Sequence, residues 1–152
     1  LGSAWFLCRY RALPPVEPRP PPLLWRAYLG VQAGGFTLYG LGLLLAPGTF
    51  GAFWPWALDG FHAQLYSAVF VAGGVGSFLL VRAAAPVELL TLGLSQAVLG
   101  GLAVLGLVLV DAGVNRVDWA LPGTWLWLAM FGVPALAGVG IALEAGRRRA
   151  AA

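Results

Sequence analysis

The residues best suited to chemistry lie together in the stretch FWPWALDGFH, residues 53–62. Trp54 and Trp56 flank a proline, Asp59 follows, and His62 is the only histidine of the chain. A neutral imidazole can ligate haem iron or the magnesium of a chlorophyll-type ring, and indole rings can pack against such groups. The sequence therefore offers His62, Trp54 and Trp56 as a candidate site for a haem, a chlorophyll-type pigment or a quinone.

The same stretch also fits the edge of a membrane protein. Tryptophan is enriched where a bilayer meets water, because its ring is apolar and its N–H is polar. In that interpretation Asp59 caps a helix and His62 bonds to Asp59 or to a loop carbonyl. A haem with two imidazole ligands would need its second histidine from another chain. The sequence leaves both interpretations open.

Other kinds of catalysis find little support in the sequence. Cys8 is the only cysteine, so neither a disulfide nor a thiolate pair can form within the chain. There is no HExxH, no phosphate-binding loop and no CxxC, and no serine lies in residues 47–62 or 111–123. Asp111, Arg116 and Asp118 are expected to form a charged cluster. We expect a protein that is not an enzyme and that holds no metal.

Composition predicts the fold class. Hydrophobic residues make up 60% of the chain and charged residues 10%, whereas soluble domains carry about 25% charged residues. Four long apolar segments contain no arginine, aspartate or glutamate, and each has about the 20 residues that a membrane helix needs. The prediction is an all-α integral membrane bundle of four spans, at residues 27–46, 63–81, 89–110 and 124–143.

The remaining segments flank this transmembrane domain, residues 27–146. Residues 1–26 include the run PPVEPRPPP, at 14–22, which favours extended polyproline II and predicts a stiff linker. The opening LGSAWFLCRYR is either the end of an earlier membrane helix or an interfacial segment. Residues 147–152 are expected to form a basic tail.

The arginines predict the orientation. With alternating spans, eight arginines fall on one side of the membrane, and Arg116 alone falls on the other; the eight are Arg9, Arg11, Arg19, Arg26, Arg82, Arg147, Arg148 and Arg149. The positive-inside rule then places both ends of the chain in the cytoplasm, and residues 47–62 and 111–123 outside. This topology explains the basic patches without a nucleic-acid partner, and the arginine triplet can also contact anionic lipid.

Internal similarity predicts two tandem hairpins. WALDG at 56–60 resembles WALPG at 119–123, and AGGVGSFL at 72–79 resembles LAGVGIAL at 136–143. A duplicated two-helix unit would produce this pattern.

Features within the spans bear on packing. Small residues recur every fourth position in each predicted helix, which favours close approach of backbones. They are Gly30 and Gly34; Ala68, Ala72 and Gly76; Gly93, Ala97 and Gly101; and Gly138, Ala142 and Gly146. Gln32 and Gln96 are expected to face protein and to bond to each other or to a partner chain, because an unpaired amide in hydrocarbon is costly. Pro134 predicts a kink that can open a cavity.

Two segments resemble uncharacterised multi-pass membrane proteins of bacteria. APGTFGAFWPWALDGFHAQLYSAVFVAGGVG, at 46–76, is similar to their W-P-W-x-L outer loop and the helix after it. NRVDWALPGTWLWL, at 115–128, is similar to their second outer loop. The resemblance implies a bacterial inner-membrane location and carries over no site residues.

Three functions follow as hypotheses. The first is a non-enzymatic accessory subunit that packs against lipids and other membrane proteins. The second is a subunit that binds quinone, haem, pigment or lipid within an electron-transfer or photosynthetic complex. The third is a small transporter or channel, which the lack of ionisable residues within the spans disfavours.

Overall fold

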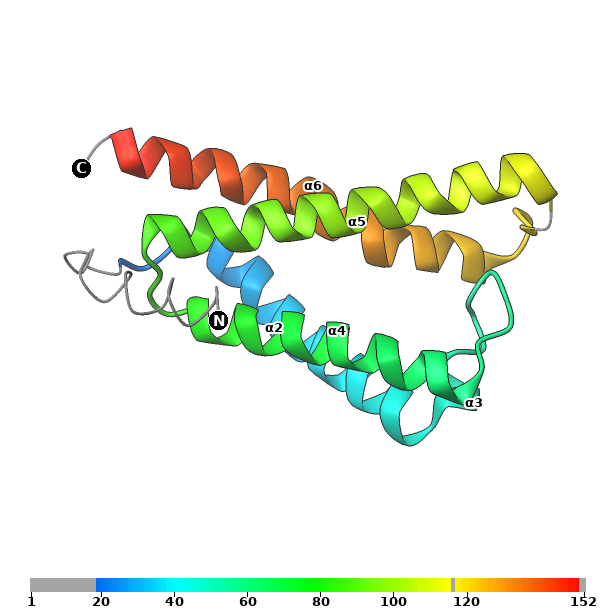
Figure 1. Cartoon of the computed structure of the whole chain (residues 1–152). Coiled ribbons are helices and arrows are strands. Elements are labelled where there is room, and N and C mark those ends of the chain that lie inside the picture. Colours follow the sequence, from blue (N-terminus) through cyan, green and yellow to red (C-terminus); the bar gives the residue numbers. More distant parts are fainter. Residues whose placement is uncertain (1–18, 116, 151–152) are drawn as a thin grey trace, which may run out of the picture.

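The computed structural model describes residues 19–115 and 117–150, and most of these residues are helical. The elements are α2 (Leu23–Leu45), the short α3 (Pro47–Phe50), α4 (Gly60–Leu80), α5 (Pro86–Val114) and α6 (Pro122–Ala150), shown in Figure 1. No strand is present in these ranges; the one isolated β-bridge joins Arg19 and Ala84. Four helices are long and apolar enough to cross a membrane. The predicted all-helical class is therefore confirmed.

The helices extend beyond the apolar segments that predicted them. α2 begins directly after Pro22, whose φ of −51° and ψ of 151° are those of polyproline II. α5 runs to Val114 and ends where Asn115 adopts a left-handed conformation, with φ 46° and ψ 51°. Arg147–Arg149 form the last turn of α6, where positive charge interacts favourably with the helix dipole. Most of the proline-rich run and residues 151–152 lie outside the described residues.

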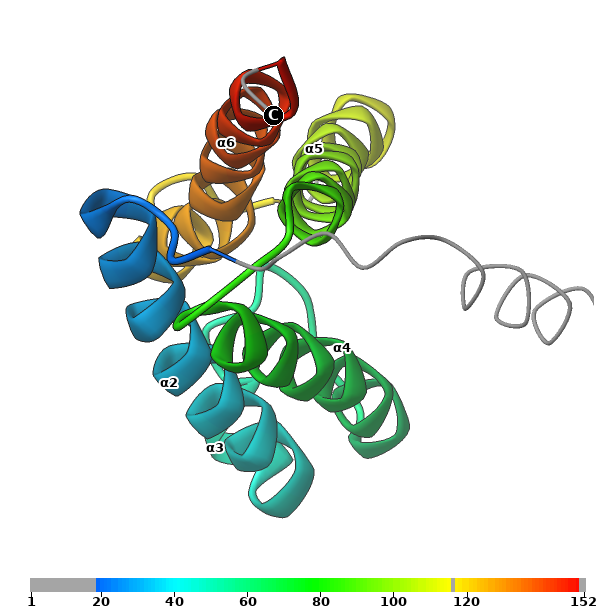
Figure 2. The same ribbon diagram turned by 90° about the vertical axis from the view of Figure 1, so that its left-hand side faces the viewer.

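The long helices pair as two consecutive hairpins. α2 packs on α4 and α5 packs on α6, while the contact between α4 and α5 is small. Figures 1 and 2 show the α5–α6 pair lying above the α2–α4 pair. The tandem hairpins expected from the sequence are therefore present.

Two hydrophobic clusters join the hairpins at opposite ends. One cluster contains Trp54, Phe70 and Trp127, and it lies toward the α3 end of the bundle. The other contains Leu29, Leu89 and Ile141, toward the end where the α4–α5 connection lies. Each cluster takes residues from both hairpins, so the hairpins are held together near both ends.

Residues 19–26, the α4–α5 connection and the end of α6 meet at one end of the bundle (Figure 1). The amides of Arg19 and Ala84 each donate to the other residue's carbonyl, at 3.2 and 3.1 Å. Arg148 bonds to Glu144 at 3.0 Å and donates to the carbonyl of Pro20 at 3.1 Å. All six arginines that the structure describes belong to these segments. Arg9, Arg11 and Arg116 lie outside the described residues.

Glycine permits close approach of α5 and α6. A Cβ added to Gly93 would lie 2.6 Å from the carbonyl oxygen of Gly138, so there is no room for one. Other members of the four-residue series have no atom within 4 Å of an added Cβ; they are Gly34, Gly76, Gly101 and Gly146. Some small residues of the series therefore lie in the contact between two helices, whereas others lie where no neighbouring atom is close.

We predict opposite effects for the same substitution at two glycines of α5. Gly93→Ala should lower the free energy of unfolding by about 1–3 kcal/mol, because the backbones must move apart. Gly101→Ala should raise it by about 0.5–1 kcal/mol, since the new methyl group meets nothing and alanine favours helix. Unfolding titrations with a denaturing detergent would measure both changes. Equal effects would show that α5 and α6 do not touch at Gly93.

Candidate functional site

His62 and Asp59 form a local pair at the start of α4. Asp59 is the N-cap, and its Oδ1 accepts a hydrogen bond from the His62 amide at 2.9 Å. Its Oδ2 lies 2.6 Å from Nδ1 of the imidazole. The bonds from the amide and from the imidazole hold the pKa of Asp59 below its usual value. Both side chains are exposed, so His62 lies on the surface beside the residue that the sequence suggested as its partner.

Trp54 and Trp56 belong to an aromatic cluster rather than to an open ring site. Trp54 is buried, its Nε1 donates to the Tyr39 hydroxyl at 2.7 Å, and its ring lies 4.7 Å from that of Tyr66. The Trp56 ring packs edge-on against Trp54 and Trp127, at 5.4 Å from each. A surface hollow of about 380 Å³ borders both tryptophans, but His62 does not line it. The three predicted site residues are thus not gathered around one hollow.

The carboxylates of the second predicted outer loop bind the loop itself. Asp111 accepts hydrogen bonds from the Val117 amide at 2.8 Å and from Trp119 Nε1 at 2.6 Å. Asp118 accepts from the Ala120 amide at 2.9 Å. The described residues contain no group of three side chains suited to holding a metal ion. These acids therefore shape the turn into α6.

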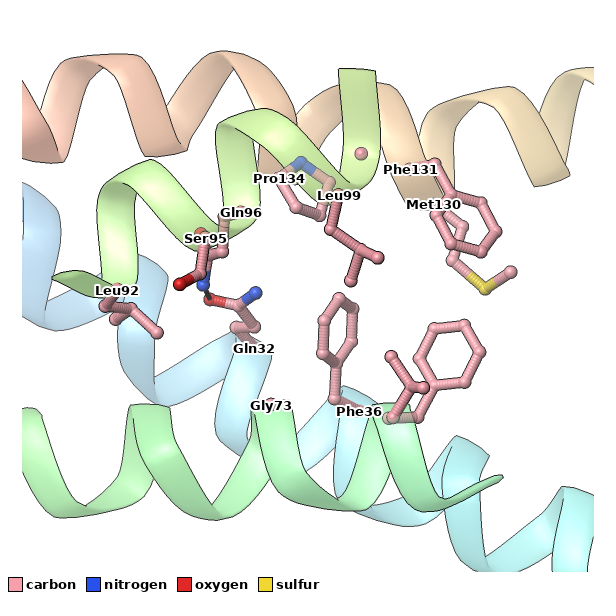
Figure 3. Close-up of a pocket in the computed structure, with 13 residues that line it drawn as sticks. Gln32, Phe36, Gly73, Leu92, Ser95, Gln96, Leu99, Met130, Phe131 and Pro134 are labelled. Carbon is pink, nitrogen blue, oxygen red and sulfur yellow. Dashed lines mark hydrogen bonds between the residues drawn. The ribbon is translucent and has the colours of Figure 1, made fainter. Parts of the chain in front are cut away.

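A cavity of about 180 Å³ lies between the two hairpins (Figure 3). All four long helices contribute to its wall, and no residue of the wall carries a charge. The wall is formed by Gln32, Phe36, Val69, Phe70, Gly73, Leu92, Ser95, Gln96, Leu99, Gly100, Met130, Phe131 and Pro134. Both hairpins therefore contribute to enclosing this space.

Two buried glutamines form the polar part of the cavity wall. Gln32 is 5% exposed and Gln96 is 9% exposed. Gln96 Nε2 donates to Gln32 Oε1 at 2.8 Å, and Ser77 donates to the same oxygen at 3.2 Å. The Tyr28 hydroxyl donates to Gln96 Oε1 at 3.2 Å. This Gln–Gln network links α2 and α4 of one hairpin to α5 of the other.

One atom of this network has no partner. Gln32 Nε2 is fully buried and makes no hydrogen bond, and in Figure 3 it points into the cavity, toward Phe36 and Leu99. Reversing both amides would keep the Gln32–Gln96 bond and leave the Gln32 oxygen unpaired instead. A buried polar group without a partner costs about 1–3 kcal/mol. In either orientation, one residue of the cavity wall, Gln32, carries an unsatisfied amide atom.

Pro134 adds to the cavity in α6. Proline has no amide hydrogen, so the carbonyl of Met130 lacks its usual helical donor, and both residues line the cavity. The sequence had singled out Gln32, Gln96 and Pro134, each for its own reason. It gave no signal for Phe36, Phe70 and Phe131, because phenylalanine is common throughout apolar helices.

Comparison of the chain with protein-family models, with curated proteins and with solved structures gives no match. The case for a function therefore rests on the geometry of the site.

A double-mutant cycle would test the glutamine network. Gln96→Leu should lower the free energy of unfolding by about 1–3 kcal/mol, because Gln32 Oε1 loses a donor and Tyr28 loses its acceptor. Gln32→Leu combined with Gln96→Leu should cost less than the sum of the single changes, by about 1 kcal/mol. Detergent-induced unfolding of the unchanged protein, the two single variants and the double variant gives the coupling free energy between Gln32 and Gln96. Additive effects would contradict the Gln32–Gln96 bond.

Proposed function

We propose that the protein is a non-enzymatic integral membrane protein of the bacterial inner membrane that binds a small, neutral, lipid-soluble molecule between its two hairpins. One observation carries the proposal: Gln32, a residue of the apolar cavity wall, has a buried amide atom, Nε2, without a hydrogen-bond partner. A ligand with a hydrogen-bond acceptor would satisfy this atom and fill the space around it.

The size and chemistry of the cavity limit its occupant. An engineered apolar cavity of about 150 Å³ binds benzene, so a cavity of about 180 Å³ has room for one substituted ring. A haem or chlorophyll macrocycle is several times larger and does not fit. A charged ligand would find no counter-charge in the wall, and burying it there would be costly. Among the ligands considered from the sequence, a quinone ring or part of a neutral lipid is the best match.

The cavity is accessible from the side rather than from the ends. Val69 of α4 and Leu99 of α5 line it and are themselves exposed. In a bilayer such exposed apolar side chains would face lipid, so the ligand would enter between α4 and α5. The accessory-subunit role expected from the sequence is compatible with ligand binding and stays a prediction. The uncharged wall offers no ion or proton pathway in support of the transporter alternative.

The proposed orientation follows from the arginine end of the bundle, which the positive-inside rule places in the cytoplasm. In a protein whose Cys8 is replaced by alanine, Ala52→Cys should react with a membrane-impermeant thiol reagent added outside intact cells. Ala150→Cys, at the opposite end and also exposed, should react only after the cells are opened. The reverse pattern would invert the topology.

The ligand-binding proposal is tested by filling the mouth of the cavity. Leu99 is 52% exposed and lines the cavity, whereas Leu102, also on α5, is 61% exposed and does not. Organic extracts of the purified protein, analysed by mass spectrometry, should contain a neutral lipid-soluble molecule in near-equal amount to the protein. Leu99→Trp should lose it and Leu102→Trp should retain it. No such molecule, or one retained in Leu99→Trp, would reject the proposal.

A further inference from the structure

We infer that the molecule held between the hairpins is a tailed quinone, with its ring in the cavity and its hydrocarbon tail in the groove between α4 and α5. This inference rests on the proposed function and adds the class of ligand and its direction in the protein.

The cavity wall suits a flat ring that carries a carbonyl group. Phe70 lies between two other phenylalanines of the wall, with ring centroids 5.3 Å from Phe36 and 5.8 Å from Phe131. These rings offer planar apolar surface to a planar ligand. A quinone carbonyl accepts hydrogen bonds, which matches the unpaired Nε2 of Gln32. With its amide reversed, the same glutamine could accept from a hydroquinone hydroxyl, so one side chain suits both states of the ring.

A groove adjoins the cavity on the side between α4 and α5. It measures about 770 Å³, lies between α4 and α5, and shares Leu92 and Ser95 with the cavity. From there it runs past Leu79, Leu80 and Val87 toward the arginine end of the bundle. The groove between α2 and α4, lined by Gly30, Gly34, Val75, Phe78 and their neighbours, shares no residue with the cavity. A tail attached to a ring in the cavity would therefore follow the α4–α5 groove.

The wall of the groove is largely apolar. Two of its polar side chains, Thr91 and Glu88, already form hydrogen bonds near the start of α5. The Thr91 hydroxyl donates to the carbonyl of Val87 at 2.8 Å. The Glu88 carboxylate accepts from the Ala85 amide at 2.7 Å and so closes the first turn of the helix. Each of these two groups already has one hydrogen-bond partner in the chain. The groove therefore suits a hydrocarbon chain better than a second polar group.

Photo-crosslinking would locate the tail. The probe is a benzoquinone with a long alkyl tail that ends in a diazirine, added to the full-length protein in detergent and irradiated. We expect saturable labelling of the groove, at Leu79, Leu80, Val87 or Leu92, which an excess of the same quinone without diazirine prevents. Gly76→Leu should lose this labelling, because its side chain enters the groove. Gly34→Leu, in the other groove, should retain it; an added Cβ meets no atom within 4 Å at either glycine.

A second ligand tests whether the carbonyl groups of the quinone ring contribute to binding. A tailed benzene of the same length, without carbonyl groups, should compete with the probe about tenfold less well, since it leaves Gln32 Nε2 unpaired. Equal competition by the two compounds would overturn the assignment of a quinone ring.

The remaining outcomes separate the inference from the function on which it rests. Labelling that is unchanged in Gly76→Leu, or spread over lipid-facing residues such as Leu102 and Leu136, would overturn the placement of the tail. If the extracted molecule depends on Leu99 but the quinone probe gives no saturable labelling, the quinone inference fails and the proposed function stands. If no molecule is extracted and no probe binds, both fail.

Discussion

The structure depends on the need to satisfy two glutamine amides inside an apolar bundle. Gln32 belongs to the first hairpin and Gln96 to the second, and each is almost completely buried. An amide in such surroundings must find a hydrogen-bond partner or lose several kcal/mol relative to water, roughly 4–8 on an alkane scale. Their mutual bond of 2.8 Å satisfies this need. It also fixes how α2 lies against α5. Other contacts between the hairpins belong to the two hydrophobic clusters nearer the ends of the bundle.

The same bond leaves the amide nitrogen of Gln32 without a hydrogen-bond partner from the described residues. A primary amide has two donor hydrogens and an acceptor oxygen, and the Gln–Gln network uses only the oxygen of Gln32. An apolar side chain of similar volume would avoid this cost, since replacing both partners of a buried hydrogen bond can be nearly neutral. Gln32 also lines the cavity between the hairpins. Together these features favour a binding site over a purely structural contact.

In most cases, a feature of this fold could be predicted from the sequence when its physical cause lies within one segment of the chain, and could not when it depends on residues from several helices. The four spans could be predicted because span length depends on hydrophobicity along the sequence alone. The helix ends could not, because α2 starts where Pro22 lies and α5 stops at Asn115, outside the apolar runs. The pairing of Gln32 with Gln96 was foreseeable because few partners exist within the spans. The cavity was not, since its wall combines ordinary residues from four helices. His62 was a candidate ligand because it is the only histidine of the chain, but being the only residue of its type does not determine whether its side chain faces solvent.

The aromatic stretch at 53–56 contributes to the cavity indirectly. Trp54 and Trp127 pack the hairpins together at one end, and Leu29, Leu89 and Ile141 do so at the other. With both ends packed, the cavity meets exposed residues on the side between α4 and α5, at Val69 and Leu99. A molecule that enters there must first dissolve in the bilayer. If the protein binds a ligand as proposed, access selects first for hydrophobicity, and the Gln32 amide then discriminates among lipid-soluble molecules by their hydrogen-bonding groups.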